Sequence, residues 1–341
     1  MRYFILFFIA MVISFALTPL VKKLAVKLDI IDIPKDARRV HNRPIPLIGG
    51  LAIYISFTVM LIGTGIFTKE KLAILIGGTI ILIGGLLDDK YDLKPVQKLI
   101  FQISAALVLI FMGVEINLLT NPFTKYISFM NLEKWLSIPV TLFWIVGVTN
   151  AFNLIDGLDG LASGLALISS VSMLAVSMIT RRDESVLLNS ILSGAILGFL
   201  PYNFNPASIF LGDTGAQLLG FLLSSIAVIG AVKSATAITL AVPIIVLGVP
   251  IYDTAFAIIR RKINGKPIMQ ADKGHIHHRL LALGFSQKKV VIIMYLISGS
   301  LGLISILAST MNSKVSYIFM IIVIIILSLL AIKLGFIKNR D

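Results

Sequence analysis

Long apolar stretches alternate with short polar ones along the whole chain. The apolar runs are about twenty residues long, rich in Ile, Leu, Val and Phe, and carry few charges. A helix of this length crosses the hydrocarbon layer of a bilayer, and the recurrence of such runs favours helices over a β-barrel. The pattern predicts an all-α, polytopic integral membrane helix bundle with about 11 transmembrane helices. The expected spans are 3–20, 47–66, 72–87, 96–114, 136–152, 161–180, 185–201, 216–232, 237–259, 289–309 and 315–335.

The polar segments between these runs are short, so residues 1–341 are expected to form a single transmembrane domain. Lys22, Lys23 and Lys27 directly follow the first run, and basic residues favour the cytoplasmic side of a membrane. This predicts an N-terminus outside and, with eleven spans, a cytoplasmic C-terminus. On that topology 21 of the 30 lysines and arginines are cytoplasmic. The expected cytoplasmic loops are 21–46, 88–98, 150–160, 201–215 and 260–289.

Composition narrows the function classes. Hydrophobic residues make up 57% of the chain and charged residues only 14%, whereas about a quarter of a soluble domain is charged. The absence of cysteine excludes disulfides, thiolate metal sites and a cysteine nucleophile. In a membrane protein, a net charge of +13 indicates basic loops beside anionic lipid, or anionic substrates. The lipid bilayer is therefore an expected partner, and nucleic acid is not.

The segment 150–162, NAFNLIDGLDGLA, directly follows an apolar run. It places Asn150, Asn153, Asp156 and Asp159 within ten residues. Ionisable groups at membrane depth are costly and usually face a cavity or a partner. The ordinary alternative is a capped helix end, where Asn, Asp and Gly commonly form turns. We interpret the segment as part of a functional site.

A second acidic group lies in 87–99, LDDKYDLKPVQKL, at the end of an apolar span. Asp88 and Asp89 are adjacent, and neighbouring carboxylates repel unless a cation or a functional role compensates. Lys98 supplies part of that compensation. The alternative is a solvated loop that neutralises itself.

A third acidic position lies in 201–217, PYNFNPASIFLGDTGAQ. Asp213 precedes an apolar span, where an aspartate is also an ordinary helix N-cap. Phe210 offers an aromatic ring on which a nucleobase could stack.

Basic residues gather in two other expected cytoplasmic loops. Arg38 and Arg43 belong to 34–50, PKDARRVHNRPIPLIGG, and a guanidinium fork matches two phosphate oxygens. Contact with lipid head groups is an equal alternative. The segment DKGHIHHRL contains a cluster of three histidines and an arginine: His275, His277, His278 and Arg279. Zinc binding by histidine is one alternative, but the remaining ligands carry oxygen and favour Mg²⁺ or Mn²⁺. We prefer histidines that donate hydrogen bonds to phosphate.

Carboxylates and amides for a hard cation, with cations for phosphates, are what phosphoryl transfer requires. The chain has neither a P-loop nor a kinase signature. An acceptor phosphate carried on a lipid would explain a site built on membrane helices. The alternative from another class is a transporter or lipid scramblase, but twelve aspartates gather on one expected face instead of lining a path, with Asp253, inside the expected ninth span, as the nearest exception.

Four segments in order, LLDDKYDL, NAFNLIDGLDGLA, FLGDTGA and GHIHHRL, resemble the signatures of the polyprenyl-phosphate N-acetylhexosamine-1-phosphate transferases. The resemblance extends from Pro34 to Arg279. It implies transfer of a sugar-1-phosphate from a UDP-sugar to a membrane polyprenyl phosphate, with release of UMP and use of Mg²⁺. Mn²⁺ is the alternative cofactor.

The resemblance also implies residue roles. Asp88 and Asp89 would serve the acceptor phosphate, with Asp88 as the proton acceptor. Asp156 and Asp159 match acidic positions used in nucleotide-sugar binding or catalysis. Asp213, with Asn153, would hold Mg²⁺ on the pyrophosphate. The expected substrate-binding residues are Arg38, Arg43, Lys98, Asn150, Asn153, Phe210, His275, His277, His278 and Arg279.

The histidine segment distinguishes two branches of this family. GHIHHRL resembles the branch that loads GlcNAc-1-phosphate onto undecaprenyl phosphate to start O-antigen, common-antigen or teichoic-acid synthesis. The branch that loads phospho-MurNAc-pentapeptide for peptidoglycan typically has three consecutive histidines followed by an acid, whereas Ile276 and Arg279 break that pattern. UDP-GlcNAc and undecaprenyl phosphate are the expected substrates, in a bacterial inner membrane, with a homodimer as one alternative assembly.

Overall fold

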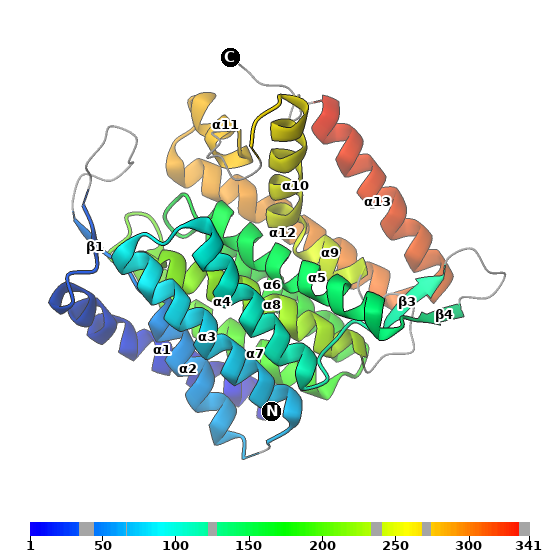
Figure 1. Cartoon of the computed structure of the whole chain (residues 1–341), viewed down its shortest axis with the longest axis horizontal. Helices are drawn as coiled ribbons and strands as arrows, with labels where there is room; N and C mark the ends of the chain where they lie inside the picture. The colour runs from blue at the N-terminus through cyan, green and yellow to red at the C-terminus, as the bar shows by residue number, and fades with distance from the viewer. Residues whose placement is uncertain (34–43, 66, 122–127, 233–240, 268–273, 334–341) are drawn as a thin grey trace.

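The computed structural model describes residues 1–33, 44–65, 67–121, 128–232, 241–267 and 274–333. Within these ranges the chain is helical apart from two short antiparallel hairpins and connecting turns (Figure 1). The helices are α1 (Arg2–Lys27), α2 (Gly50–Gly63), α3 (Lys69–Tyr91), α4 (Pro95–Phe111), α5 (Lys134–Ile155), α6 (Leu161–Ile179), α7 (Asp183–Asn203), α8 (Gly212–Val232), α9 (Ala241–Val246), α10 (Gly248–Ile263), α11 (Ile276–Ala282), α12 (Gln287–Thr310) and α13 (Ser313–Lys333). The hairpins pair β1 (Ile31–Asp32) with β2 (Ile45–Pro46), and β3 (Leu118–Asn121) with β4 (Ser128–Asn131).

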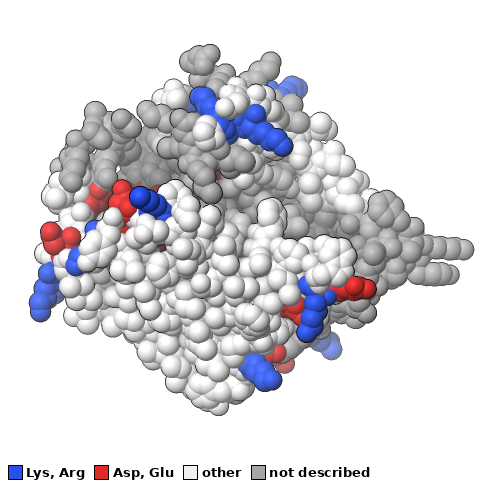
Figure 2. Space-filling model, in the orientation of Figure 1, with Lys and Arg blue, Asp and Glu red and all other residues white. Residues whose placement is uncertain are grey.

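The helices agree with a multi-pass membrane protein. In the described residues, α1, α3, α5, α6, α7, α8 and α12 are long and apolar enough to cross a membrane. Shorter apolar helices occupy Gly50–Gly63, Pro95–Phe111 and Ile318–Leu329, within three further expected spans. On the face shown in Figure 2 the centre of the molecule is white, and the blue and red charged atoms lie toward its edges. This distribution is the one expected of a protein with an apolar belt.

The expected ninth span, 237–259, is wrong as a single helix. Its first residues lie outside the described ranges, and the rest divides into α9 and α10 at Leu247, whose backbone is not helical. Pro250 explains the break, because it has no N–H to donate to the carbonyl of Val246. In Figure 1, α10 crosses the direction of α9. The two hairpins and α11 are further elements that the apolar pattern did not predict.

Helix α8 is the centre of the bundle. Of its most apolar window, 94% is buried inside the protein, and it packs against α2, α3, α5, α6 and α7. Glycines allow the neighbouring helices to approach its first turn. A Cβ on Gly50 would lie 2.1 Å from Cα of Gly215, and one on Gly85 would lie 2.4 Å from Cα of Thr214. These contacts bring the first residue of α2 and the C-terminal part of α3 against the start of α8.

The segment before α8 is held by main-chain hydrogen bonds to the segment before α2. Phe210 donates its N–H to the carbonyl of Pro46 at 2.8 Å. Gly49 and Gly50 return N–H groups to the carbonyls of Phe210 and Leu211, each at 3.0 Å. Two loops that are remote in the sequence are thereby fixed at one end of the bundle.

We predict that Gly85→Ala destabilises the protein, because the added methyl group must displace the backbone of α8. The expected loss is about 1–3 kcal/mol in the free energy of unfolding, the usual cost of overpacking. Thermal unfolding in detergent measures it. Gly147→Ala is the matched control, since a Cβ there meets nothing within 4 Å. Equal stability of the two variants would contradict the close packing of α3 on α8.

Candidate active site

A cavity of about 620 Å³ opens where α3, α5 and α8 end or begin. Its volume lies within the range of small-molecule sites, about 300–1,000 Å³. Its lining brings together five parts of the chain that the sequence separates widely: residues 31–47, 88–92, 156–159, 203–213 and 278–287. The residues that line it are Ile31, Asp32, Ile33, Leu47, Asp88, Asp89, Lys90, Asp92, Asp156, Gly157, Leu158, Asp159, Asn203, Phe210, Leu211, Gly212, Asp213, His278 and Gln287.

Asp89, at the end of α3, caps the N-terminus of α8. Its Oδ1 accepts the N–H of Asp213 at 2.8 Å, and its Oδ2 accepts the N–H of Thr214 at 3.1 Å and the Thr214 hydroxyl at 2.5 Å. The first N–H groups of a helix have no partner within that helix and favour a negative charge. Gly212 makes room for this contact, because a Cβ there would lie 2.6 Å from Oδ2 of Asp89. The cap is supplied by α3, which leaves the Asp213 carboxylate available for other contacts.

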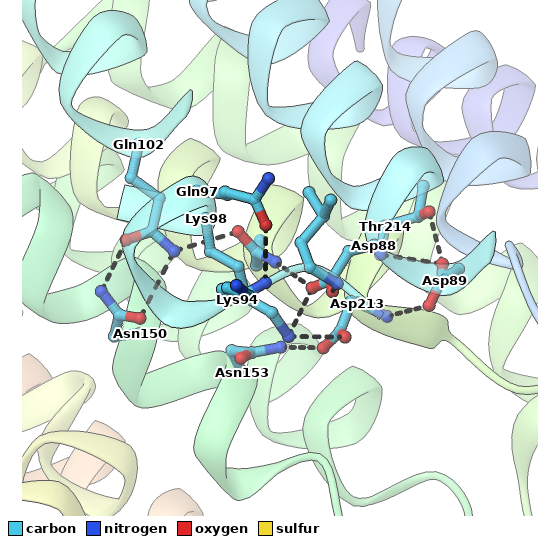
Figure 3. A network of polar contacts seen from close by, with 12 residues as sticks. Asp88, Asp89, Lys94, Gln97, Lys98, Gln102, Asn150, Asn153, Asp213 and Thr214 are labelled. Carbon is cyan, nitrogen blue, oxygen red and sulfur yellow. Dashed lines mark hydrogen bonds and ion pairs between the residues drawn. The ribbon is translucent and has the colours of Figure 1, made fainter. Parts of the chain in front are cut away.

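Lys98 joins two carboxylates across the cavity wall (Figure 3). Its Nζ lies 2.6 Å from Oδ2 of Asp88 and 3.2 Å from Oδ2 of Asp213. Asp88 is buried, and its Oδ1 accepts the N–H of Leu93 at 2.9 Å. The predicted binding residue Lys98 therefore contacts both the predicted proton acceptor and the predicted metal ligand. The adjacent residues Asp88 and Asp89 make different contacts. Asp88 pairs with Lys98, and Asp89 caps α8.

The two asparagines of α5 lie at different depths. Asn153 donates from Nδ2 to Oδ1 of Asp213. The two residues that the resemblance assigned to one metal site are therefore in contact. Asn150 lies one turn away, and neither asparagine is among the residues that line the cavity. Its amide pairs with Gln102 of α4, at 2.6 Å from Nδ2 to Oε1 and 3.3 Å from Nε2 to Oδ1. Substrate contact by Asn150 stays a prediction.

Asp156 directly follows α5 and lines the same cavity. Loss of solvent around its carboxyl, followed by repulsion from Asp213, Asp89 and Asp159, raises its pKa well above the usual range. Only the second part of this shift reflects the other negative charges around the cavity. A bound cation or a cationic side chain would relieve it.

Asp159 is engaged in holding the loop between α7 and α8. Its Oδ2 accepts from Nδ2 of Asn205 at 3.1 Å and from the N–H of Ala207 at 3.0 Å. Asn205 also donates to Oε1 of Gln287 at 3.1 Å, at the start of α12. Asp159 therefore positions the loop that carries Phe210. Its predicted catalytic role stays a prediction.

The histidine segment is anchored by a residue for which the sequence provided no role. Asp253 of α10 is buried and lies 2.7 Å from Nδ1 of His275. Its other oxygen accepts the N–H of Ile276 at 2.8 Å, at the start of α11. A carboxylate on Nδ1 sets the orientation of an imidazole ring. Its place inside an expected apolar span was the signal that Asp253 required a partner.

His277 packs against the central motif. A Cβ on Gly157 would lie 2.7 Å from Nε2 of His277, so only glycine fits beneath the ring. Burial, with smaller effects from neighbouring charges, lowers the pKa of His277 to about 3. The ring is therefore neutral at physiological pH. The His278 ring lies tilted against that of His277, with 4.3 Å between the ring centroids, and His278 lines the cavity.

The remaining predicted residues divide by position. Phe210 lines the cavity, half-buried, where its ring is accessible to a ligand. Arg279 donates from Nε to the carbonyl of Gly274 at 3.0 Å, within the histidine segment. Arg38 and Arg43 lie outside the described residues. Sequence reasoning missed Asp32, Asp92 and Gln287, which also line the cavity.

Comparison with known proteins identifies the family. The profile of glycosyl transferase family 4 matches residues 71–231. The chain is 39% identical to the probable undecaprenyl-phosphate N-acetylglucosaminyl 1-phosphate transferase of Bacillus subtilis, over 99% of this chain and 94% of that protein. The chain belongs to the polyprenyl-phosphate sugar-1-phosphate transferases of glycosyl transferase family 4. It is therefore a membrane-bound sugar-phosphate transferase, and the transporter interpretation is wrong.

Two further relatives help to place it within the family. The undecaprenyl-phosphate alpha-N-acetylglucosaminyl 1-phosphate transferase of Thermotoga maritima is 33% identical over 78% of each chain. The phospho-N-acetylmuramoyl-pentapeptide-transferase of Staphylococcus aureus is 32% identical, over 76% of this chain and 84% of that protein. The full-length match to the Bacillus protein supports the N-acetylglucosaminyl branch.

We predict that His277 makes stability depend on pH in the acid range. An unfolded histidine gains a proton near its ordinary pKa of 6.5, whereas folded His277 resists protonation down to about 3. Protons therefore favour the unfolded state between these values, and stability falls as pH decreases through that window. His277→Gln should reduce this fall, measured as thermal midpoint against pH in detergent.

His278→Gln is the control, because it changes a half-buried histidine in the same helix. It should retain the acid-dependent loss. Parallel curves for wild type and His277→Gln would show that His277 contributes nothing to the pH dependence.

Proposed function

We propose that the protein transfers GlcNAc-1-phosphate from UDP-GlcNAc to undecaprenyl phosphate and releases UMP. The observation that carries this proposal is the pairing of Lys98 with two carboxylates of the cavity lining, Asp88 and Asp213. The names of the Bacillus and Thermotoga relatives support the donor and the acceptor. The product is a lipid-linked pyrophosphoryl sugar for surface-polysaccharide or cell-wall synthesis.

The reaction exchanges one phosphoanhydride bond for another. An oxygen of the acceptor phosphate attacks the sugar-bearing phosphorus of the donor, and the bond between the two donor phosphates breaks. UMP leaves with the bridging oxygen. The ammonium group of Lys98 offsets negative charge on the phosphate oxygens. Where the acceptor phosphate carries a proton, the Asp88 carboxylate removes it. Half-buried Phe210 offers its ring to the uracil.

Asp213 and Asn153 fit a Mg²⁺ site. In the described part of the chain, no three His, Asp or Glu side chains form a closed metal cage. Mg²⁺ is commonly held by one or two carboxylates, with substrate phosphates and water completing its shell. Burial, and then repulsion from Asp213, Asp89 and Asp159, raises the pKa of Asp156, and a cation nearby would relieve that repulsion. When bound, Mg²⁺ or Mn²⁺ supplies charge neutralisation at the donor phosphates.

The reaction is proposed to occur on the cytoplasmic face of the bacterial cell membrane. The cavity lies between segments 31–33, 88–92 and 156–159, which belong to or adjoin the basic loops expected inside. Basic residues next to spans favour the cytoplasm, which supports this sidedness and an external N-terminus.

We predict that the purified protein releases UMP when it is given undecaprenyl phosphate, UDP-GlcNAc and Mg²⁺. EDTA should abolish release, and Mn²⁺ should restore it. UDP-MurNAc-pentapeptide should give no product, because a site that hydrogen-bonds particular sugar groups discriminates strongly against analogues. Preference for the pentapeptide donor would assign the chain to the branch of the Staphylococcus relative.

Asp213→Asn should reduce turnover at least about a hundredfold, since the change removes the charged ligand proposed for Mg²⁺ at the donor phosphates. The variant should still fold, because the α8 cap comes from Asp89 and not from the side chain of Asp213. Initial rates and thermal midpoints test both statements. Wild-type turnover of Asp213→Asn would remove that carboxylate from the reaction.

A further inference from the structure

Three buried or half-buried amide side chains form a layer directly beneath the ionic groups of the site. Lys98 and Gln102 are one turn apart on α4, as are Asp213 and Gln217 on α8. On α5, Asn153 faces the site and Asn150 lies a turn deeper. Side chains three or four positions apart share one face of a helix. Each of three helices therefore contributes one group to the site and one amide to the layer below it (Figure 3).

The amides are joined in a chain that ends on Asp88. Nδ2 of Asn150 donates to Oε1 of Gln102 at 2.6 Å, and Nε2 of Gln102 donates to Oε1 of Gln217 at 3.0 Å. Nε2 of Gln217 then donates to Oδ2 of Asp88 at 3.4 Å. Gln102 and Gln217 are 1% and 2% exposed, so water does not substitute for these partners. Burying such amides costs free energy unless they are paired.

Both ends of this chain of hydrogen bonds require the amide side chains to point their N–H groups in the same direction. The carbonyl of Val146 only accepts hydrogen bonds, so the nitrogen of Asn150 must face it, at 2.9 Å. The Asp88 carboxylate also accepts, so the nitrogen of Gln217 must face that end. These two requirements orient every amide between them consistently. A chain with a single permitted orientation holds its terminal acceptor more firmly than a reversible one does.

We propose that Gln102, Gln217 and Asn150 are positioning residues that hold Asp88 against Lys98 and the cavity. Asn150 then acts through Gln102, which differs from the substrate contact expected from the sequence. None of the three residues lines the cavity, and they fix the Asp88 carboxylate, which does. Only the kinetic consequence rests on the transfer reaction proposed above.

Two substitutions test the chain. Gln102→Met and Gln217→Met keep an unbranched side chain of similar size and remove the hydrogen bonds. The backbone N–H of Leu93 reports directly on Asp88, because it donates to the other carboxylate oxygen. We expect faster hydrogen exchange at Leu93 in both variants, with amides in the second half of α8 unchanged. Exchange at Leu93 as slow as in wild type in Gln217→Met would overturn the proposal.

Steady-state kinetics provide a second test of the same proposal. Each variant should lower kcat about tenfold, the order expected on losing a hydrogen bond to a charged group, and change KM for UDP-GlcNAc by less than about twofold. Because the two glutamines act in series, the double variant should be no slower than the slower single variant. If the two losses in kcat multiply in the double variant, the glutamines act independently, and the proposal that they act in series is overturned.

Ser225→Ala is the matched control. Ser225 is buried on α8 two turns from Gln217, and its hydroxyl donates to the carbonyl of Phe221. Both readouts should stay at wild-type values. A wild-type protein that releases no UMP would refute the proposed function alone, because exchange at Leu93 measures the position of Asp88 without substrate.

Discussion

The capping of α8 by Asp89 is the interaction on which the site depends. The start of the central helix α8 has N–H groups that need an acceptor, and here a neighbouring helix provides it. The contact fixes the end of α3 to the start of α8, with Gly212 and Gly85 removing the side chains that would separate them. It also frees the Asp213 carboxylate from capping its own helix, so that it can face Lys98 and Asn153.

The remaining segments are attached to this junction by single, specific contacts. The histidine segment is fixed to α10 by Asp253 and touches the central motif where His277 packs on Gly157. The loop before α8 is fixed by Asp159 through Asn205 and Ala207. Both attachments bring residues from remote parts of the chain to one cavity. A rigid framework of this kind suits a reaction in which two phosphate groups must be held in line.

The apolar pattern was enough to predict a polytopic helical protein, because span length is fixed by bilayer thickness. It failed at residues 237–259, where a regular apolar composition hides the effect of Pro250 on the hydrogen-bond ladder. The sequence placed Asp88, Asp156 and Asp213 in one site, and the cavity contains all three.

The sequence could not separate the roles of Asp88 and Asp89, because that depends on which carboxylate meets the end of α8. Gln102 and Gln217 were missed, although each lies four residues after a predicted site residue on an apolar helix. A buried amide at that spacing is a usable signal, since an apolar face gives it no other partner.

The central claim is that the carboxylate cluster around Asp213 is the place of phosphoryl transfer. The most direct measurement is a crystal structure with UDP-GlcNAc and Mn²⁺, in which anomalous scattering locates the metal. The account predicts one strong peak beside Asp213 and Asn153, in contact with the donor diphosphate. A peak at the histidines of α11, or a donor bound outside the cavity, would contradict it.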